Sequence, residues 1–217
     1  MKTIIIANQK GGSGKSTLVT HLAVAAELAG EKPVLLTDTD PQGTVADWFN
    51  ARETADPGYV PATMSTLREK IVALQEAGAK WFFVDTAPAI TEKNTELLKL
   101  ADLIIVPLCA SPNDIRALAK TLPILHEAGK PFVFVLTRVN PQARLTMQIA
   151  IALSEHGQVL QPPLRERVIY PTSMVDGRTV QEIDPSGPAS KEITELWENV
   201  KRFFDDKTKK SFNRKTK

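Results

Sequence analysis

The stretch that decides the fold reads Lys10-Gly11-Gly12-Ser13-Gly14-Lys15-Ser16-Thr17. It follows the apolar run 3–7 and precedes an Ala- and Leu-rich helical pattern over 16–29. Glycines let the backbone turn tightly and direct successive N–H groups at phosphate oxygens, and the start of the next helix adds its positive dipole. This stretch therefore predicts a phosphate-binding loop between a strand and a helix.

Two side chains of the loop point to nucleotide chemistry. Lys15 is placed to reach the β- and γ-phosphates, and the Ser16 hydroxyl to ligate Mg²⁺. The common G-x-x-x-x-G-K-[ST] pattern would need a glycine at position 9, where this chain has Gln9, followed by Lys10. A chance glycine-rich turn is the alternative, and the intact ending with a strand before it and a helix after it argues against that.

The rest of the chain alternates short apolar runs with helical patterns. The further apolar runs are 33–37, 81–84, 103–106 and 132–136. The helical patterns between them are 64–77, 92–99, 113–128 and 142–155. Strands that are apolar throughout and separated by helix-length segments indicate a parallel sheet covered on both faces. The sequence therefore predicts a doubly wound α/β fold, with a mainly parallel sheet flanked by helices, as one domain over 1–204.

Three carboxylates follow two of these predicted strands. Asp38 and Asp40 come after the run 33–37, and Asp85 comes after 81–84. The carboxyl ends of parallel strands face the ligand crevice, so these groups should lie beside the phosphate loop. One of them can hold Mg²⁺, directly or through water, and another can orient a water for attack on the γ-phosphate. Aspartate also caps helices after strands, which would account for Asp38 or Asp85 alone.

Composition excludes several classes of protein. The chain has 217 residues, 42% of them hydrophobic and 24% charged, as in a soluble globular domain. The lone cysteine, Cys109, excludes an internal disulfide framework and argues against a cysteine-based zinc or iron–sulfur site. No apolar run approaches the roughly 20 residues that span a bilayer, and the N-terminus lacks a signal-peptide pattern. We therefore expect a cytoplasmic protein.

The C-terminal end is strongly basic. Residues 201–217 carry eight Lys and Arg against two Asp, which leaves 19 basic and 23 acidic residues elsewhere. We predict a basic, flexible tail over 205–217, suited to nucleic acid or anionic lipid or simply solvated. The helical pattern over 187–204 carries an apolar stripe that is typical of core packing, and a membrane-inserting helix is the weaker alternative.

The base can also be inferred. Guanine-specific proteins of this kind usually carry an Asn-Lys-x-Asp signature after a later strand. Here the run 132–136 leads into Thr137-Arg138-Val139-Asn140, without that signature. Adenine is therefore the predicted base, and ATP with Mg²⁺ the predicted ligand.

Taken together, these residues resemble the ParA/MinD group of P-loop ATPases, whose deviant phosphate loop reads K-G-G-x-G-K-[ST]. The resemblance extends over residues 2–204 and is nearest to the small ParA proteins. Beyond the phosphate loop, the segments that carry it are 38–43, 85–88, 111–114, 177–182 and 189–193.

The resemblance implies a role for each site residue. Lys10 would reach across an ATP-sandwiched homodimer to the partner's phosphates, and Lys15 would bind phosphates within its own subunit. Asp40 would position the attacking water. The metal group would be Ser16, Asp38 and Asp85. The implied ATP contacts are Lys10, Gly11, Gly12, Ser13, Gly14, Lys15, Ser16, Thr17, Arg138 and Met174. Of these, Arg138 and the loop around Met174 would pack the adenine.

The resemblance also implies a function: plasmid or chromosome partition by an ATPase that is slow unless stimulated. ATP would close a homodimer, with a higher polymer as the alternative, that binds DNA non-specifically and associates with the nucleoid. A ParB-like partner would then stimulate hydrolysis, with no membrane involved. Candidate DNA-binding cations on the folded surface are Arg165, Arg167, Arg178 and Lys191.

Other functions are built on the same phosphate loop. A MinD-like membrane-cycling positioner would need a larger apolar face near the C-terminus, and a positioner of a protein cluster would share the ATP cycle. A reductase of the nitrogenase iron-protein type needs two cysteines from each subunit, which Cys109 alone cannot supply. A small-molecule ligase such as dethiobiotin synthetase is disfavoured by the segment 38–43.

Overall fold

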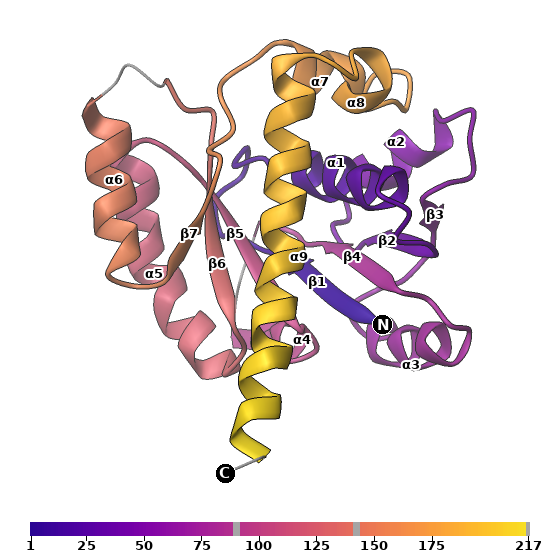
Figure 1. Ribbon diagram of the computed structural model, residues 1–217, viewed down its shortest axis with the longest axis horizontal. Coiled ribbons are helices and arrows are strands. Elements are labelled where there is room, and N and C mark those ends of the chain that lie inside the picture. Colours follow the sequence, from indigo (N-terminus) through magenta and orange to yellow (C-terminus); the bar gives the residue numbers. More distant parts are fainter. Residues whose placement is uncertain (89–91, 141–143, 216–217) are drawn as a thin grey trace.

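All seven strands in the described part of the chain join one sheet, and every neighbouring pair is parallel. The computed structural model describes residues 1–88, 92–140 and 144–215 (Figure 1). The strand order is β3-β2-β4-β1-β5-β6-β7. The strands are β1 (Lys2–Ile6), β2 (Val34–Asp38), β3 (Gly58–Tyr59), β4 (Trp81–Asp85), β5 (Leu103–Cys109), β6 (Phe132–Thr137) and β7 (Gln158–Leu160). The predicted parallel α/β sheet is confirmed.

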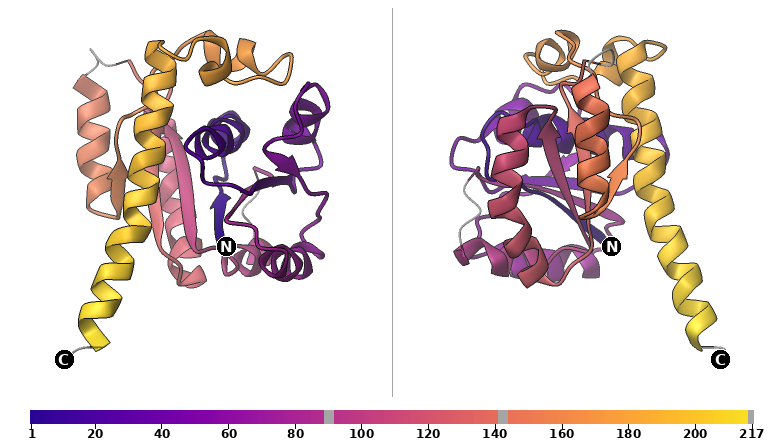
Figure 2. Two further views of the ribbon diagram at one scale, coloured as in Figure 1. Left: turned by 45° about the vertical axis from the view of Figure 1, so that its right-hand side comes forward. Right: turned by 90° about the vertical axis from the view of Figure 1, so that its left-hand side faces the viewer.

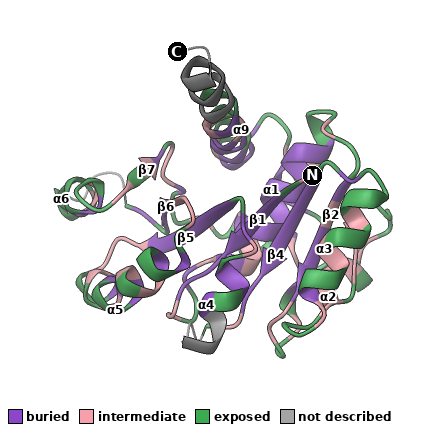
Figure 3. Ribbon diagram, turned by 90° about the horizontal axis from the view of Figure 1, so that it is seen from below, coloured by how far each residue is buried: buried purple, intermediate pink, exposed green. Residues whose placement is uncertain are grey.

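Helices cover both faces of the sheet, as Figures 2 and 3 show. One core cluster joins the strands to α1 (Lys15–Leu28), α2 (Thr44–Asn50), α7 (Ile169–Ser173), α8 (Val180–Ile183) and α9 (Pro188–Lys215). The other joins them to α3 (Leu67–Glu76), α4 (Glu92–Leu98), α5 (Pro112–Ala128) and α6 (Arg144–Ser154). The strands lie between two apolar layers, which is why their sequences do not alternate.

The central strand β1 contributes side chains to both apolar layers. Ile4 and Ile6 pack into the layer under α1 and α9, while Ile5 packs into the opposite layer. All three side chains are fully buried. Successive side chains of a strand point to opposite faces, so an uninterrupted apolar run is what a doubly covered strand requires.

The strand order determines where a ligand can bind. β1 lies between β4 and β5. The helix after β1 covers one face and the helix after β5 covers the other. In an open parallel sheet, ligands bind outside the carboxyl ends of the strands at such a switch point. The loop 7–14, which carries the glycines of the predicted phosphate loop, leaves β1 at this position.

The long C-terminal helix α9 confirms the predicted core stripe. Its side chains Ile193, Leu196 and Trp197 are buried, and the Trp197 ring lies 4.8 Å from that of Trp81 on β4. The predicted end at 204 is wrong, because the helical backbone continues to Lys215 and projects beyond the sheet (Figures 1 and 2). The flexibility of the basic tail stays a prediction. In the described part of the chain, no helix has the length and apolarity to cross a membrane.

Several short elements have no counterpart in the sequence prediction. They are β3, β7, α2, α7 and α8, which span two to seven residues each. A pattern of period 2 or 3.6 needs more residues than these elements contain, so contacts with the rest of the fold decide their conformation. Two of them, α2 and α7, supply or hold parts of the site described below.

A buried histidine makes the stability of the fold depend on pH. His21 on α1 is fully buried, with Nδ1 2.8 Å from the Thr17 carbonyl oxygen and Nε2 3.4 Å from Ser173 Oγ on α7. Burial lowers the pKa of His21 to about 4, although the Thr17 carbonyl acts in the opposite direction. The unfolded chain therefore takes up a proton first as the pH falls below about 6.5.

We predict that His21→Gln flattens the acid side of the stability profile. The contribution of neutral His21 is complete above the unfolded pKa and is lost as the pH falls toward 4. Between pH 6.5 and 4.5 the unaltered chain should lose about 2 kcal/mol more than the variant, measured by urea unfolding. His156→Gln, at an exposed histidine, is the control. Equal losses in all three proteins would contradict the assignment.

Candidate functional site

The phosphate loop has the backbone that its glycines predict. Gly12 and Gly14 have φ of 72° and 93°, in the left-handed region that favours glycine, and Gly14 caps the start of α1. Ser13 between them is buried, and its Oγ has no hydrogen-bond partner among the described residues. Its carbonyl oxygen accepts a hydrogen bond of 2.9 Å from Thr137 Oγ1 at the end of β6. The loop is thus held against the end of β6, with an unsatisfied hydroxyl group inside it.

Lys15 lies at the base of the loop. It is 7% exposed, and its Nζ donates to the Lys10 carbonyl oxygen at 3.4 Å. Burial lowers the pKa of Lys15, while the charges of Asp85 and Asp40 raise it. The ammonium group is therefore close to two carboxylates in a partly desolvated position, where an added polyphosphate would gain strongly from it.

Ser16 and Asp85 meet where α1 begins and β4 ends. Ser16 Oγ donates a hydrogen bond of 2.6 Å to Asp85 Oδ2. Burial raises the pKa of Asp85 to about 7, and the Ser16 hydrogen bond opposes that shift. The Asp38 charge also raises this pKa. A hydroxyl and a buried carboxylate are hard oxygen donors that fit Mg²⁺.

The described residues offer no metal site made of protein side chains alone, since no group of three or more His, Cys, Asp or Glu is placed to hold an ion. This agrees with the way Mg²⁺ is usually bound, through one or two carboxylates together with the phosphates of a substrate. Ser16 and Asp85 would therefore hold the ion jointly with a nucleotide.

Asp38 is already engaged by the backbone of the segment that follows it. Asp38 Oδ1 accepts from the Asp40 N–H, and Oδ2 accepts from the Val45 N–H, each at 2.8 Å. Burial raises the pKa of Asp38, and these hydrogen bonds counter it. The structure thus shows Asp38 anchoring the loop 39–43, which we call switch loop I. A metal role for Asp38 stays a prediction.

Lys10 lies outside the cavity beside the phosphate loop. Its Nζ forms an ion pair of 2.7 Å with Oδ2 of Asp114 on α5. Asp114 is fully buried, its Oδ2 also accepts from Ser111 Oγ, and its Oδ1 has no partner in the described part of the chain. The hydrogen bond to Asp114 raises the pKa of Lys10. Ser111 and Asp114 belong to the segment 111–114, which carries part of the family resemblance, but no sequence pattern predicts their contact with Lys10.

A cavity of about 530 Å³ opens above the phosphate loop. One side is the phosphate loop, another is Asp40, Gln42 and Thr44, and Pro88 closes a third. The remaining wall consists of Thr137, Arg138, Leu164, Arg165, Glu166, Arg167, Val168, Tyr170 and Pro171, and of these residues the sequence predicted only Arg138 as an ATP contact. The volume lies within the roughly 300–1,000 Å³ of small-molecule and cofactor pockets, so a nucleotide fits.

The two predicted adenine contacts are placed differently. Arg138 lines the cavity, has a left-handed φ of 52°, and donates to the Gly12 carbonyl oxygen at 3.5 Å. Met174 does not line the cavity and packs against the core, with its Sδ 3.9 Å from Thr20 Oγ1. Of its neighbours, Tyr170 and Pro171 face the cavity instead. The isolated bridge between Val139 and Arg165 brings the cavity wall 164–171 to the end of β6. No sequence pattern predicts this contact.

Comparisons with known proteins agree with this geometry. The model of the CobQ/CobB/MinD/ParA nucleotide-binding domain matches residues 4–180. The maintenance of carboxysome distribution protein A of Halothiobacillus neapolitanus is 28% identical, over 91% of this chain and 95% of that protein. The protein ParA of Rhizobium radiobacter is 27% identical, over 78% of this chain and 81% of that protein.

Among solved structures, the septum site-determining protein MinD of Pyrococcus horikoshii, complexed with Mg-ADP, has the same fold. Its TM-score is 0.72 at 17% identity, with 92% of this chain and 95% of that chain covered. These matches bear out the resemblance drawn from the sequence motifs.

We predict that Asp85→Asn removes the Mg²⁺-dependent part of nucleotide binding. The amide keeps the shape of the side chain and loses the charge that favours the ion, so ATP affinity in Mg²⁺ should fall by roughly 10- to 100-fold. Affinity in EDTA should change little. Calorimetry of ATP binding measures both. Asp47→Asn, at an exposed carboxylate on α2, is the matched control. An unchanged affinity in Mg²⁺ would contradict the assignment.

Proposed function

The chain belongs to the CobQ/CobB/MinD/ParA nucleotide-binding domain family, and from this premise we propose that it is an ATP hydrolase that partitions a cargo along DNA. In the proposed cycle, Mg-ATP pairs two copies of the chain, and the pair binds DNA without sequence preference. A ParB-like partner on the cargo then stimulates hydrolysis and so releases the DNA. The observation that carries the proposal is a nucleotide-sized cavity whose signature cation, Lys10, is held just outside it.

The position of Lys10 supports a contact between Lys10 of one copy and the nucleotide bound to the second copy. Its ion pair with Asp114 keeps the ammonium group away from the cavity of its own subunit. In a paired form, Lys10 would exchange this single carboxylate for the triphosphate of the second copy. Asp114 would then be left fully buried without its ion-pair partner, which is unfavourable. A highly charged ligand is needed to offset that cost, which favours ATP over ADP.

Hydrolysis would use groups at the edge of the cavity. Asp40 lies on switch loop I and lines the cavity, where its carboxylate can orient a water toward the γ-phosphate. Lys10 of one copy and Lys15 of the other would stabilise the charge that develops on the transferred phosphoryl group. When bound, Mg²⁺ would neutralise phosphate charge beside Ser16 and Asp85.

The cargo has two candidates, each favoured by a relative. The resemblance to ParA partition proteins favours DNA as cargo, and the protein ParA of Rhizobium radiobacter is among the similar proteins. The protein from Halothiobacillus neapolitanus is named for carboxysome distribution and is similar over nearly its whole length, which favours a protein cargo as the second candidate. Both share the ATP cycle and the DNA track, and they differ in the partner that stimulates hydrolysis.

The four candidate DNA-binding cations are not equally available. Arg165 and Arg167 both pair with Glu192, at 3.7 and 2.7 Å, and both line the cavity. Arg178 pairs with Asp176 at 2.5 Å. Lys191 is exposed and has no ion pair within the described ranges. We therefore propose Lys191 and the basic end of α9 as the phosphate contacts.

The central test is DNA binding in three nucleotide states. We expect the chain to bind non-specific duplex DNA with Mg-ATP and not with Mg-ADP or without nucleotide. Affinity should fall with salt, because each contacted phosphate contributes about −0.9 to the slope of log K against log salt. Fluorescence anisotropy at two salt concentrations measures both effects.

Other outcomes of this test would contradict the proposal. Equal DNA affinity in all three nucleotide states would mean that the basic tail binds DNA as a simple polycation, without control by ATP. If DNA is not bound, and vesicles of anionic phospholipid are bound with Mg-ATP, a membrane-cycling positioner would replace the partition function.

We predict that Lys10→Ala retains ATP binding but abolishes pairing and hydrolysis. The phosphate loop and Lys15 remain, so ATP affinity should change by less than about tenfold, whereas the cation supplied to the second copy is lost. Sedimentation and phosphate release measure the two effects. Lys120→Ala, which removes another cation of the α5 side near Lys10, should behave as the unaltered chain. Normal hydrolysis by Lys10→Ala would show that the role assigned to Lys10 is wrong.

A further inference from the structure

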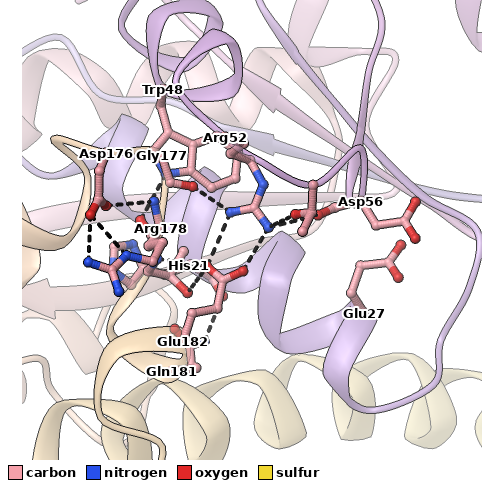
Figure 4. Close-up of polar contacts among 12 residues, drawn as sticks. His21, Glu27, Trp48, Arg52, Asp56, Asp176, Gly177, Arg178, Gln181 and Glu182 are labelled. Atoms are coloured by element: carbon pink, nitrogen blue, oxygen red, sulfur yellow. Dashed lines mark hydrogen bonds and ion pairs between the residues drawn. The ribbon is translucent and has the colours of Figure 1, made fainter.

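The segment 177–182 carries part of the family resemblance but does not line the cavity. Instead it holds Arg52, the second residue after α2. The side chain of Arg52 is only 3% exposed, and its Nη2 lies 2.7 Å from Glu182 Oε1. Its Nη1 donates to Glu182 Oε2 at 3.1 Å and to the Gly177 carbonyl oxygen at 2.5 Å. Figure 4 shows the guanidinium group between these partners. Such a two-point pair fixes both distance and orientation.

Three further contacts hold the same end of α2. The guanidinium carbon of Arg52 lies 4.5 Å from the centre of the Trp48 ring, and Trp48 Nε1 donates to the Arg178 carbonyl oxygen at 2.9 Å. Gly177 has a φ of 75°, and a Cβ built there would lie 2.4 Å from the Arg52 nitrogen. The two backbones therefore touch, and only glycine fits. We call this set of contacts, made by Trp48 and Arg52 with 177–182, the α2 clamp.

The opposite end of α2 carries switch loop I. The Val45 N–H on the first turn donates to Asp38, and the Gly43 N–H donates to the Asp40 carbonyl oxygen at 3.0 Å. α2 has seven residues, so roughly 10 Å of helix separates the clamp from the loop. A helix this short is marginal by itself and takes its position from what holds it.

The clamp segment is in turn fixed to the helix of the phosphate loop. Gln181 is buried, and its Nε2 donates to the His21 carbonyl oxygen on α1 at 2.9 Å. Thr179 and Glu182 cap α8 reciprocally, which makes the segment rigid. The phosphate loop and switch loop I thus share one anchor on the face of the sheet opposite α5.

We propose that Arg52 is a positioning residue for hydrolysis: through the α2 clamp it sets where Asp40 stands relative to the phosphate loop. The proposal rests on the proposed function, because it takes Asp40 as the residue that orients the water. Arg52 itself is remote from the cavity lining and touches no reacting atom. Its effect is on geometry, where a misplacement of about 1 Å can cost on the order of 100-fold in rate.

The test compares turnover with nucleotide affinity in three variants. Arg52→Lys keeps the charge and loses the fork, and Glu182→Gln keeps the acceptor oxygen and loses the charge. Each should lower the kcat for ATP by roughly 10- to 100-fold. The KM should stay within about threefold, because the phosphate loop is untouched. The double variant should be no slower than the slower single variant, since both changes break one contact.

Controls separate this effect from lost stability. Assays run well below the Tm of each variant, and calorimetry gives the number of nucleotide sites per chain. Glu96→Gln, which breaks an exposed ion pair with Lys99 on the opposite face of the sheet, should leave turnover unchanged. The proposal is overturned if kcat is unchanged in the folded variants or if KM rises as kcat falls. It is also overturned if the effects of the two substitutions on kcat are additive in the double variant.

The same variants distinguish failure of this proposal from failure of the proposed function. If the unaltered chain does not hydrolyse ATP with DNA and partner present, the proposed function is wrong. In that case, hydrogen exchange of the nucleotide-bound protein tests whether the α2 clamp holds switch loop I, independently of hydrolysis. Faster exchange at 39–43 in Arg52→Lys, with 10–17 unchanged, upholds the clamp, and equal exchange at 39–43 overturns it.

Discussion

The hydrogen bond from Ser16 to the buried carboxylate of Asp85 is the contact on which the rest of the site depends. It joins the first turn of α1 to the end of β4, the strand between β1 and β2. The carbonyl oxygen of Asp85 also accepts from the N–H and Oγ1 of Thr39, the first residue of switch loop I. Asp85 therefore contacts both the phosphate loop and switch loop I. The register of β2, β4 and β1 sets the distance between the two loops.

Much of this arrangement could be predicted because it is encoded locally. Glycines at 12 and 14 supply the left-handed backbone of the phosphate loop, and the apolar runs supply doubly covered strands. Asp38 and Asp85 fall at paired positions of β2 and β4, so their proximity follows from a parallel sheet. The apolar stripe of α9 could likewise be predicted, because its helical periodicity extends over several turns.

The parts that could not be predicted depend on contacts between distant, short elements. The partner of Lys10 is Asp114, 104 residues further on, and no pattern links the two. Arg52 meets Glu182 across 130 residues through α2 and α8, which are too short to show a period. The cavity wall 164–171 is joined to the end of β6 and the residues after it by the Val139–Arg165 bridge and by backbone hydrogen bonds of Leu164 and Glu166, which no sequence pattern indicates. Met174, predicted beside adenine, lies three residues beyond Pro171 of that wall and packs into the core.

The proposed cycle requires that ATP in this cavity makes two copies of the chain associate. Sedimentation velocity of the unaltered protein tests it most directly, with Mg²⁺ and a non-hydrolysable ATP analogue, with Mg-ADP, and without nucleotide. We expect twice the mass of the chain with the analogue and the mass of a single chain in the other two states. The same mass in all three states would contradict the proposed cycle.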